Sequence, residues 1–165
     1  ESNNLNFCGC FDTFKAVAQY AEETGLEAER SSAGGENAIT IGEALEATAE
    51  TTVGNKPVDK SDAAAIQAAE MRAMGSNVSP PGGLAAMAQS AAAYNADCKR
   101  DLDKVKLADI LSGATTKLPA DKAATLQDAE RVASAEVRNN PDVTATPGGV
   151  AASVAAAARL NDNVK

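Results

Sequence analysis

The chain has 165 residues, of which 23 are acidic and 15 basic, and its net charge is -8. Alanine supplies 37 residues, whereas Leu, Ile, Val and Phe together supply 28; because alanine is the strongest helix former, we expect a mainly α-helical chain with a thin core. Histidine is absent, which excludes from this chain a Ser-His-Asp triad, a Cys-His dyad and any histidine-ligated metal.

Residues 1–38 are expected to form an amino-terminal segment with one helix and a glycine-rich linker. Asp12 or Thr13 can cap a helix that runs toward Arg30, and a linker through Gly34-Gly35 follows. This segment holds all three phenylalanines, Phe7, Phe11 and Phe14. We expect them to pack against the rest of the chain, because exposure would leave a large apolar patch.

The strongest signal in the sequence is an internal repeat. A shift of 66 positions aligns Ile39–Asn95 with Val105–Asn161 without a gap, and 15 of the 57 positions are identical. Equal loop lengths predict two copies of one structural unit. We therefore expect two tandem modules, 39–97 and 98–165, each with three short helices. Neither module has enough large side chains for a core of its own, so the two are expected to pack around a pseudo-two-fold axis.

The first helix of each module is expected near its start. Thr40 and Glu43 fit a capping box, which predicts a helix over Thr40–Glu50. The equivalent helix, Leu107–Ala114, lacks that box. As an alternative, the apolar-polar alternation at 39–41 and 105–107 allows one short strand in each module, and the two strands could pair with each other.

The second helix is expected over Asp62–Met74 and over Asp128–Asn139. Short polar side chains precede both helices, and a helix-stopping residue follows each. These expected caps and stops are Asp59 or Ser61 with Gly75 in the first module, and Thr125 with Pro141 in the second.

The third helix is expected to begin at Pro81-Gly82-Gly83 and at Pro147-Gly148-Gly149. One helical face in each module carries a large residue about once per turn, separated by small ones. The expected core faces are Leu84, Met87, Ala88, Ala91 and Tyr94, and Val150, Ser153, Val154, Ala157 and Leu160.

Three features could carry chemistry, beginning with the two Pro-Gly-Gly triplets. Free amides at a helix start can bind an anion. However, no Lys or Arg lies within six residues of either triplet, and neither has the spacing of a phosphate-binding motif. We favour a structural role, in which proline sets the first turn and the glycines permit close packing.

The second feature is the set of three cysteines, Cys8, Cys10 and Cys98. Their odd number does not fit a disulfide framework and indicates a reducing compartment. Free thiols are the favoured interpretation. A disulfide from Cys98 to Cys8 or Cys10, and a metal site, remain the alternatives, although the spacing is not that of a structural zinc site.

The third feature is the charged pair that both modules share, Glu70 with Arg72 and Glu136 with Arg138. Residues two apart on a helix do not face each other. We expect each side chain to reach a neighbouring helix or a free helix end. The charged stretch Asp97–Lys106 is expected to be a solvated linker.

Several stretches of the chain resemble a known family. Ala38–Ala47 resembles the start of a seed maturation protein module, and Lys56–Glu70 continues it. Ala135–Pro141 and Pro147–Val154 resemble a second module. These modules define one family of plant late embryogenesis abundant proteins, and the resemblance covers about Ala38–Val164.

The resemblance implies a non-enzymatic protein of the cytoplasm and/or nucleus that accumulates as seeds mature and dry. The expected function is therefore protection of other proteins during water loss. A different class, a specific interaction module that docks through the Phe-rich amino-terminal helix, is the alternative. We assign no catalytic, cofactor-binding or metal-binding residue.

The expected partners are many weakly bound protein clients, with a homodimer as a further alternative. Nucleic acid is not expected, because tight binding needs clustered Lys and Arg. A membrane span is not expected either, because the apolar runs are much shorter than the roughly 20 residues needed.

Overall fold

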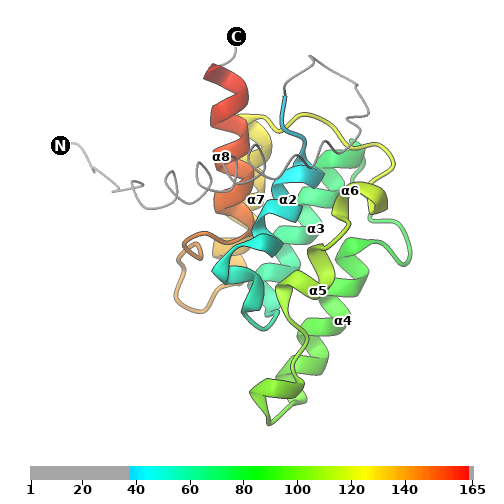
Figure 1. Cartoon of the computed structure of the whole chain (residues 1–165), viewed down its shortest axis with the longest axis vertical. Helices are drawn as coiled ribbons and strands as arrows, with labels where there is room; N and C mark the ends of the chain where they lie inside the picture. Colours follow the sequence, from blue (N-terminus) through cyan, green and yellow to red (C-terminus); the bar gives the residue numbers. More distant parts are fainter. Residues whose placement is uncertain (1–37, 164–165) are drawn as a thin grey trace, which may run out of the picture.

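The structure, a computed structural model, describes residues 38–163 (Figure 1). The amino-terminal helix expected from Asp12 or Thr13 toward Arg30, and its phenylalanines, lie outside the described residues. Seven α-helices and two short 3-10 turns make up the described part, which confirms the mainly α-helical prediction.

The elements follow the repeat. The first module contains α2 (Ile41–Glu50), the 3-10 turn η1 (Thr52–Asn55), α3 (Lys60–Met74) and α4 (Leu84–Asp97). The connection contains η2 (Asp101–Asp103), and the second module contains α5 (Leu107–Leu111), α6 (Ala114–Lys117), α7 (Leu126–Asn139) and α8 (Val150–Asn163). The helix expected over Leu107–Ala114 is thus broken in two, and Gly113 lies at the break with φ +71°.

The predicted helix caps are confirmed. The Glu43 N–H donates to Thr40 Oγ1 at 3.1 Å, and the Thr40 N–H donates to Glu43 Oε2 at 2.8 Å. Asp59 caps α3, and Thr125 caps α7. Gly75 ends α3 in the left-handed conformation, with φ +60°. Local side-chain chemistry therefore sets where these helices begin and end.

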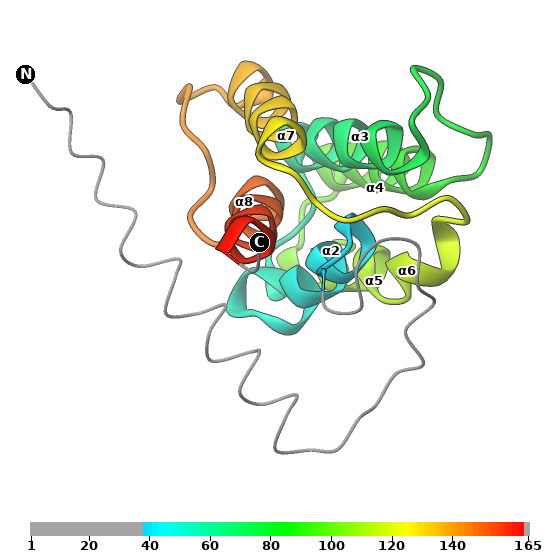
Figure 2. The same ribbon diagram turned by 90° about the horizontal axis from the view of Figure 1, so that it is seen from above.

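Six of the helices form a closed ring. Around it, α3 contacts α7, α7 contacts α8, α8 contacts α2, α2 contacts α5, α5 contacts α4, and α4 contacts α3. Figure 2 shows α7 and α3 side by side, with α8 and α2 opposite them. The two equivalent helices α3 and α7 meet, and so do α2 and α5. The modules therefore pack around a pseudo-two-fold axis, which passes between α3 and α7 and between α2 and α5.

The first helix of each module lies on the third helix of the other module. An isolated antiparallel β-bridge joins Thr40 to Ala123, and its equivalent joins Lys106 to Pro57. The described residues contain no strand longer than these single bridges. The expectation that segments 39–41 and 105–107 pair with each other is therefore wrong: each pairs with the loop before the second helix of the opposite module.

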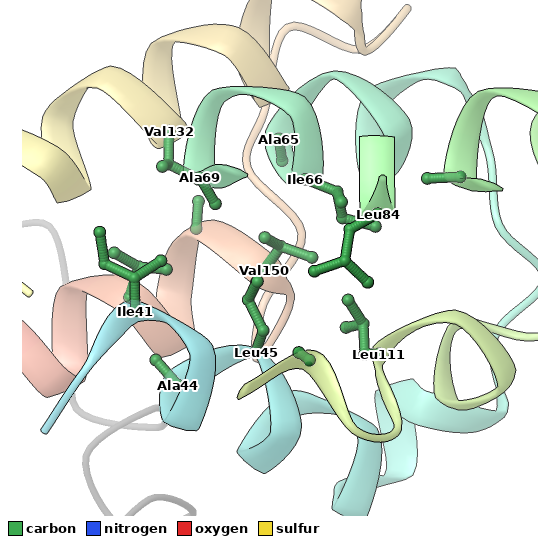
Figure 3. Close-up of a cluster of buried hydrophobic side chains, with 14 of the residues drawn as sticks. Ile41, Ala44, Leu45, Ala65, Ile66, Ala69, Leu84, Leu111, Val132 and Val150 are labelled. Carbon is green, nitrogen blue, oxygen red and sulfur yellow. The ribbon is translucent and has the colours of Figure 1, made fainter. Parts of the chain in front are cut away.

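The core combines many alanines with a few branched side chains. Figure 3 shows Ile41 and Leu45 of α2 facing Ile66, Leu84 and other residues from both modules. All four of these side chains are fully buried. A single cluster spans the two modules, so each module supplies part of the other's core.

The inward face of α4 differs from the expected one. Met87 and Tyr94 are 37% and 55% exposed, whereas Ala85 and Ala92 are buried. The helix is turned so that Asn95 also faces inward, where it is 7% exposed. The alanine face lets the α4 backbone approach its neighbours closely, which Met87 and Tyr94 in that position would prevent.

Separated modules test the shared core. Because each first helix packs on the other module, we expect fragments Gly35–Asp97 and Lys99–Lys165 to unfold without a cooperative transition when alone. An equimolar mixture should regain a cooperative thermal transition, followed by circular dichroism at 222 nm. Two fragments that each unfold cooperatively with the stability of the full chain would contradict this arrangement.

Candidate functional site

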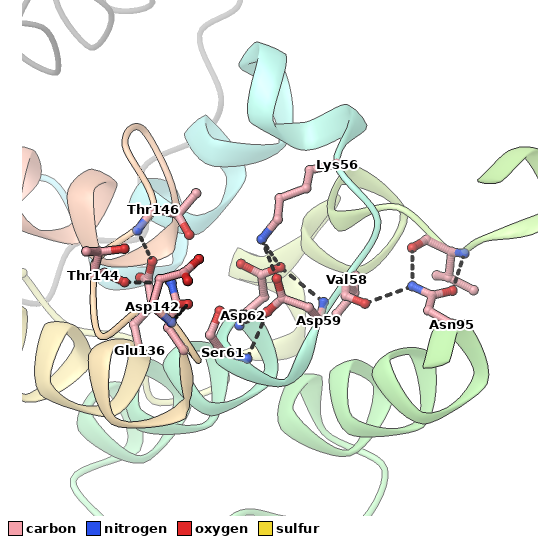
Figure 4. A network of polar contacts seen from close by, with 12 residues as sticks. Lys56, Val58, Asp59, Ser61, Asp62, Asn95, Glu136, Asp142, Thr144 and Thr146 are labelled. Carbon is pink, nitrogen blue, oxygen red and sulfur yellow. Dashed lines mark hydrogen bonds and ion pairs between the residues drawn. The ribbon is translucent and has the colours of Figure 1, made fainter. Parts of the chain in front are cut away.

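Both Pro-Gly-Gly helix starts are already occupied by a carboxylate of the chain itself. Glu70 extends from α3, and its Oε1 accepts the N–H of Leu84, the first residue of α4, at 2.8 Å. Glu136 extends from α7 and accepts the Ala151 N–H of α8 at 3.1 Å and the Thr146 N–H at 2.6 Å (Figure 4). Both glutamates are fully buried. The prediction that they reach a free helix end is confirmed, and the anion at each helix start is internal.

Gly83 is required by this contact. A Cβ atom at Gly83 would overlap Glu70 Oε1. The two modules differ slightly, because the position of Thr146 is taken by Pro80, which has no N–H to donate. The Glu70 carboxylate therefore accepts hydrogen bonds from the first N–H groups of α4 and from none in the loop before it. The triplet has the structural role that the sequence favours, with close approach of a carboxylate as its reason.

A second pair of buried acids, Asp62 and Asp128, lies at the starts of α3 and α7. Lys56 donates to Asp62 Oδ2 at 2.8 Å, and Lys122 donates to Asp128 Oδ2 at 2.6 Å. Arg72 then crosses from α3 to donate to Asp128 Oδ1 at 2.6 Å. This ion pair links the two modules at the axis.

The pseudo-symmetric bond to Asp62 is not formed. Asp62 Oδ1 is buried and has no hydrogen-bond partner. Arg138, the equivalent of Arg72, donates instead to the Ser134 carbonyl of its own helix at 3.1 Å. The expectation that both arginines reach a neighbouring helix or a helix end is therefore correct for Arg72 and wrong for Arg138. A carbonyl one turn away offers Arg138 a local acceptor on an exposed face.

The pKa values of Asp62 and Asp128 are shifted in opposite directions. Burial by itself raises the pKa of Asp128, but hydrogen bonds from Lys122, Arg72 and Thr125 outweigh it and hold that pKa below its ordinary value. Burial raises the pKa of Asp62 above its ordinary value, because the hydrogen bond from Lys56 offsets only part of the desolvation. Without an arginine contact, and with the Asp59 carboxylate nearby, Asp62 is more easily protonated than Asp128.

Two asparagines hold the crossing between modules. The Asn95 amide donates to the carbonyls of Val58 at 2.9 Å and Val105 at 2.8 Å, while its Oδ1 accepts the Val105 N–H at 2.8 Å (Figure 4). Asn161 makes the equivalent three bonds, to Ala124 and to both backbone groups of Ile39. Sequence reasoning gave these asparagines no role, although their identity in the two repeats was a signal.

Of the three cysteines, Cys98 lies in the part of the chain that the structure describes. It is half-buried at the end of α4, with its sulfur 3.4 Å from the Arg100 carbonyl oxygen. Cys8 and Cys10 lie outside the described residues, so the choice among free thiols, a disulfide and a metal site stays a prediction. Of the linker predicted over Asp97–Lys106, residues 98–104 form a charged, mostly exposed connection with ion pairs Arg100–Asp103 and Lys104–Asp101. Val105 and Lys106 instead contact the first module.

Within residues 38–163, no cluster of three His, Cys, Asp or Glu side chains is arranged to bind a metal ion. No helix in that range is long and apolar enough to cross a membrane. The buried acids described above each contact a helix start or a basic side chain. Their chemistry in this arrangement is therefore to hold helices in place.

Comparison with known proteins identifies relatives. The family model described as Seed maturation protein matches residues 39–98 and again residues 105–164. The chain is 65% identical over 91% of its length to late embryogenesis abundant protein D-34 of Gossypium hirsutum, and 62% identical over 90% to late embryogenesis abundant protein 31 of Arabidopsis thaliana. It spans 56% and 58% of those two proteins. No solved structure matches the chain.

A shorter relative matches over nearly its whole length. Late embryogenesis abundant protein 50 of Arabidopsis thaliana is 39% identical, and the match covers 91% of this chain and 94% of that protein. The matches to D-34 and to protein 50 each include 150 residues, which is more than the two modules hold. They therefore extend into residues 1–37, beyond the stretch that resembles the family in its motifs.

The Glu70 carboxylate can be tested by substitution. Glu70→Ala leaves the buried Leu84 N–H without an acceptor and should lower the free energy of unfolding by about 2 kcal/mol, with about 1 kcal/mol for Glu70→Gln. Gln67→Ala, on the same helix with only an exposed hydrogen bond to Gln89, should cost less than about 0.5 kcal/mol. Urea unfolding followed by circular dichroism measures all three. If Gln67→Ala and Glu70→Ala lowered the free energy of unfolding equally, the Glu70 cap would not be a specific source of stability.

Asp62 and Asp128 form a matched pair for a pH test. At pH 7, Asp128→Asn should cost about 2 kcal/mol, because the Lys122 and Arg72 partners are lost, and Asp62→Asn should cost less than about 1 kcal/mol. The lowered pKa of Asp128 gives stability that is present above the unfolded value, about 3.9, and is lost as pH falls through its folded value. The raised pKa of Asp62 has the opposite effect. Its contribution to the free energy of unfolding is present below the unfolded pKa of about 3.9 and is lost as pH rises through the folded pKa.

Unfolding in urea at pH 7 and pH 3.5 measures these changes. Asp128→Asn should therefore narrow the difference in stability between the two pH values, and Asp62→Asn should widen it. The same pH response in both variants would contradict the asymmetry.

Proposed function

Because the chain belongs to the seed maturation protein family of late embryogenesis abundant proteins, we propose that it protects other proteins of the maturing seed during water loss. The names of its relatives support a role in late seed development. The protective mechanism proposed here is non-catalytic and needs no cofactor. We propose the cytoplasm and/or nucleus as its location.

One structural observation carries this proposal: the described helical body exposes only a few large apolar groups. The chain as a whole carries a net charge of -8. Of the large apolar side chains exposed in residues 38–163, Met87 and Tyr94 both belong to α4. The others come from loops, the connection and the start of α7; they are Val78, Leu102, Leu126 and Val143. A net charge of this size keeps a small protein soluble at high concentration. Dispersed apolar groups give weak contacts and do not form one strong docking face.

These properties suit a protein that separates others. As water leaves, proteins become concentrated until their transiently exposed apolar surfaces meet and aggregate. An abundant acidic protein between them slows that encounter. Its weak apolar contacts are reversible, so clients are released on rehydration. Such protection depends on the ratio of protectant to client and does not require a nucleotide.

A drying assay tests the proposal. A dehydration-sensitive enzyme dried with the full chain should retain more activity after rehydration than the same enzyme dried with an equal mass of an inert globular protein. Protection should rise with the molar ratio and should be the same with and without nucleotide. Equal protection by the inert protein would contradict the proposal.

Two variants separate the alternatives. A Cys8→Ser, Cys10→Ser, Cys98→Ser variant should protect as well as the parent, because the proposed mechanism uses no thiol. A Phe7→Ser, Phe11→Ser, Phe14→Ser variant tests docking through the amino-terminal segment. Loss of all protection in the phenylalanine variant, with an unchanged helical spectrum, would favour the specific interaction module.

A further inference from the structure

The backbone hydrogen bonds of the bridge between the modules occur twice, with the roles of the modules exchanged. The Ile41 N–H donates to the Lys122 carbonyl at 2.9 Å, and the equivalent Leu107 N–H donates to the Lys56 carbonyl at 2.9 Å. Each bridge is completed by a second backbone bond, of 3.0 Å to the Ile39 carbonyl and 3.1 Å to the Val105 carbonyl. Each module therefore contributes the same backbone N–H and carbonyl groups to the bridges as the other module does.

The two crossing points differ in how the chain connects the segments that meet there. At the first, Asn95 hydrogen-bonds to Val105, and the short connection 98–104 also joins α4 to Val105 along the chain. At the second, Asn161 holds Ile39 through the same three bonds, although 122 positions separate them in the sequence. The second junction thus keeps the geometry of the first without a short covalent connection. The connection is therefore not what positions the modules.

The connection itself is weakly held. It projects from one end of the body between α4 and α5 (Figure 1). Leu102 at its tip is 96% exposed, and no residue of 98–104 belongs to the core. Its ion pairs, Arg100–Asp103 and Lys104–Asp101, are surface pairs that contribute little to stability. Opened out, seven residues reach about 23 Å, enough to pass between two adjacent bodies.

We propose that two copies of this chain exchange modules when water is withdrawn, so that each first module packs on the second module of the other chain. The product is a closed dimer with two bodies, each with the core and bridges described above. Its interface is isologous at the level of the dimer, since both chains give and receive the same modules. The partner surface is therefore the intramolecular module interface, and the partner is a second copy of the chain.

Concentration decides between the two forms. A short flexible connection gives the second module an effective concentration of about 1 mM near the first, so at about 10 µM chain the exchanged dimer should be roughly 1% of the protein. Drying carries the chain concentration well above 1 mM, where encounters between chains outnumber those within one. Separation of the modules opens the shared core, so the exchange is slow to reverse after rehydration. This inference does not require that the chain protect other proteins.

A disulfide across a bridge distinguishes exchange from surface association. The backbone bonds flank the bridged pair Pro57 and Lys106, which makes them a non-hydrogen-bonded antiparallel pair, with Cα atoms about 4.5 Å apart. That separation suits a disulfide. The test variant is the full chain with Pro57→Cys and Lys106→Cys, and with Cys8, Cys10 and Cys98 changed to Ser.

The reduced variant is divided into two samples. One is kept at 10 µM, and the other is dried and rehydrated to 10 µM; both are then oxidised. On a denaturing, non-reducing gel the first sample should be almost entirely monomer, because its disulfide lies within one chain. The dried sample should contain a covalent dimer as a major band, a rise of about ten-fold or more. Pro57→Cys alone and Lys106→Cys alone, in the same background, should give no such increase, because an exchanged dimer joins position 57 only to position 106.

The symmetry-related pair, Thr40→Cys with Ala123→Cys, must give the same result, and native mass spectrometry of the dried parent chain should show a species of twice 16.7 kDa. A dimer after drying whose disulfides all lie within single chains would show surface association and overturn the proposal. A dried sample that stays monomeric by both measurements would also overturn it. Neither result affects the drying assay for client proteins, so the two proposals fail separately.

Discussion

Six hydrogen bonds from two asparagine side chains fix how this chain folds back on itself. Asn95 and Asn161 each saturate backbone groups on two segments, one from their own module and one from the other. Without these bonds, four backbone groups at the crossing points would lose these hydrogen-bond partners, at a cost of about 1–3 kcal/mol each where the group is buried. They are the carbonyls of Val58 and Ala124 and the N–H groups of Val105 and Ile39. The crossing in turn places α2 on α8 and α5 on α4, and so closes the ring of helices.

This reliance on directed bonds follows from the composition. A core made largely of methyl groups gains less from burial than one of leucine and phenylalanine, and methyl groups pack in many equivalent ways. Hydrogen bonds and buried carboxylates select one of them. Glu70 and Glu136 each tie the second helix of a module to the start of the third. Arg72 then joins the modules through Asp128. Charged groups that elsewhere would indicate a catalytic site serve here to specify the packing.

The sequence predicts the local features well. Caps at Thr40, Asp59 and Thr125 and the stop at Gly75 depend on a few neighbouring residues, and all four are confirmed. The crossing could not be predicted, because the two modules carry the same backbone donors and acceptors at equivalent positions, and the repeat does not say which copy a segment pairs with. The orientation of α4 was missed for a related reason: an alanine-rich helix has several faces of similar polarity, and the buried Asn95 decides among them.

The asymmetry at Asp62 also lay beyond the sequence. Arg72 and Arg138 are identical positions in the repeat, yet only one bridges the axis. Small differences in local geometry decide which acceptor each of these long arginine side chains contacts. Lys56 with Lys122, and Asp62 with Asp128, are likewise identical at equivalent positions of the repeat, but that identity alone does not say that each lysine binds the aspartate of its own module.

The bonds between Asn161 and Ile39 bring the first and last parts of the folded body to one point, where Asn161 Oδ1 lies 2.7 Å from the Ile39 amide nitrogen. The two ends of the described body, residues 38 and 163, therefore lie near each other. A body built in this way can be inserted into a longer chain as a closed loop, since neither flanking segment has to cross it.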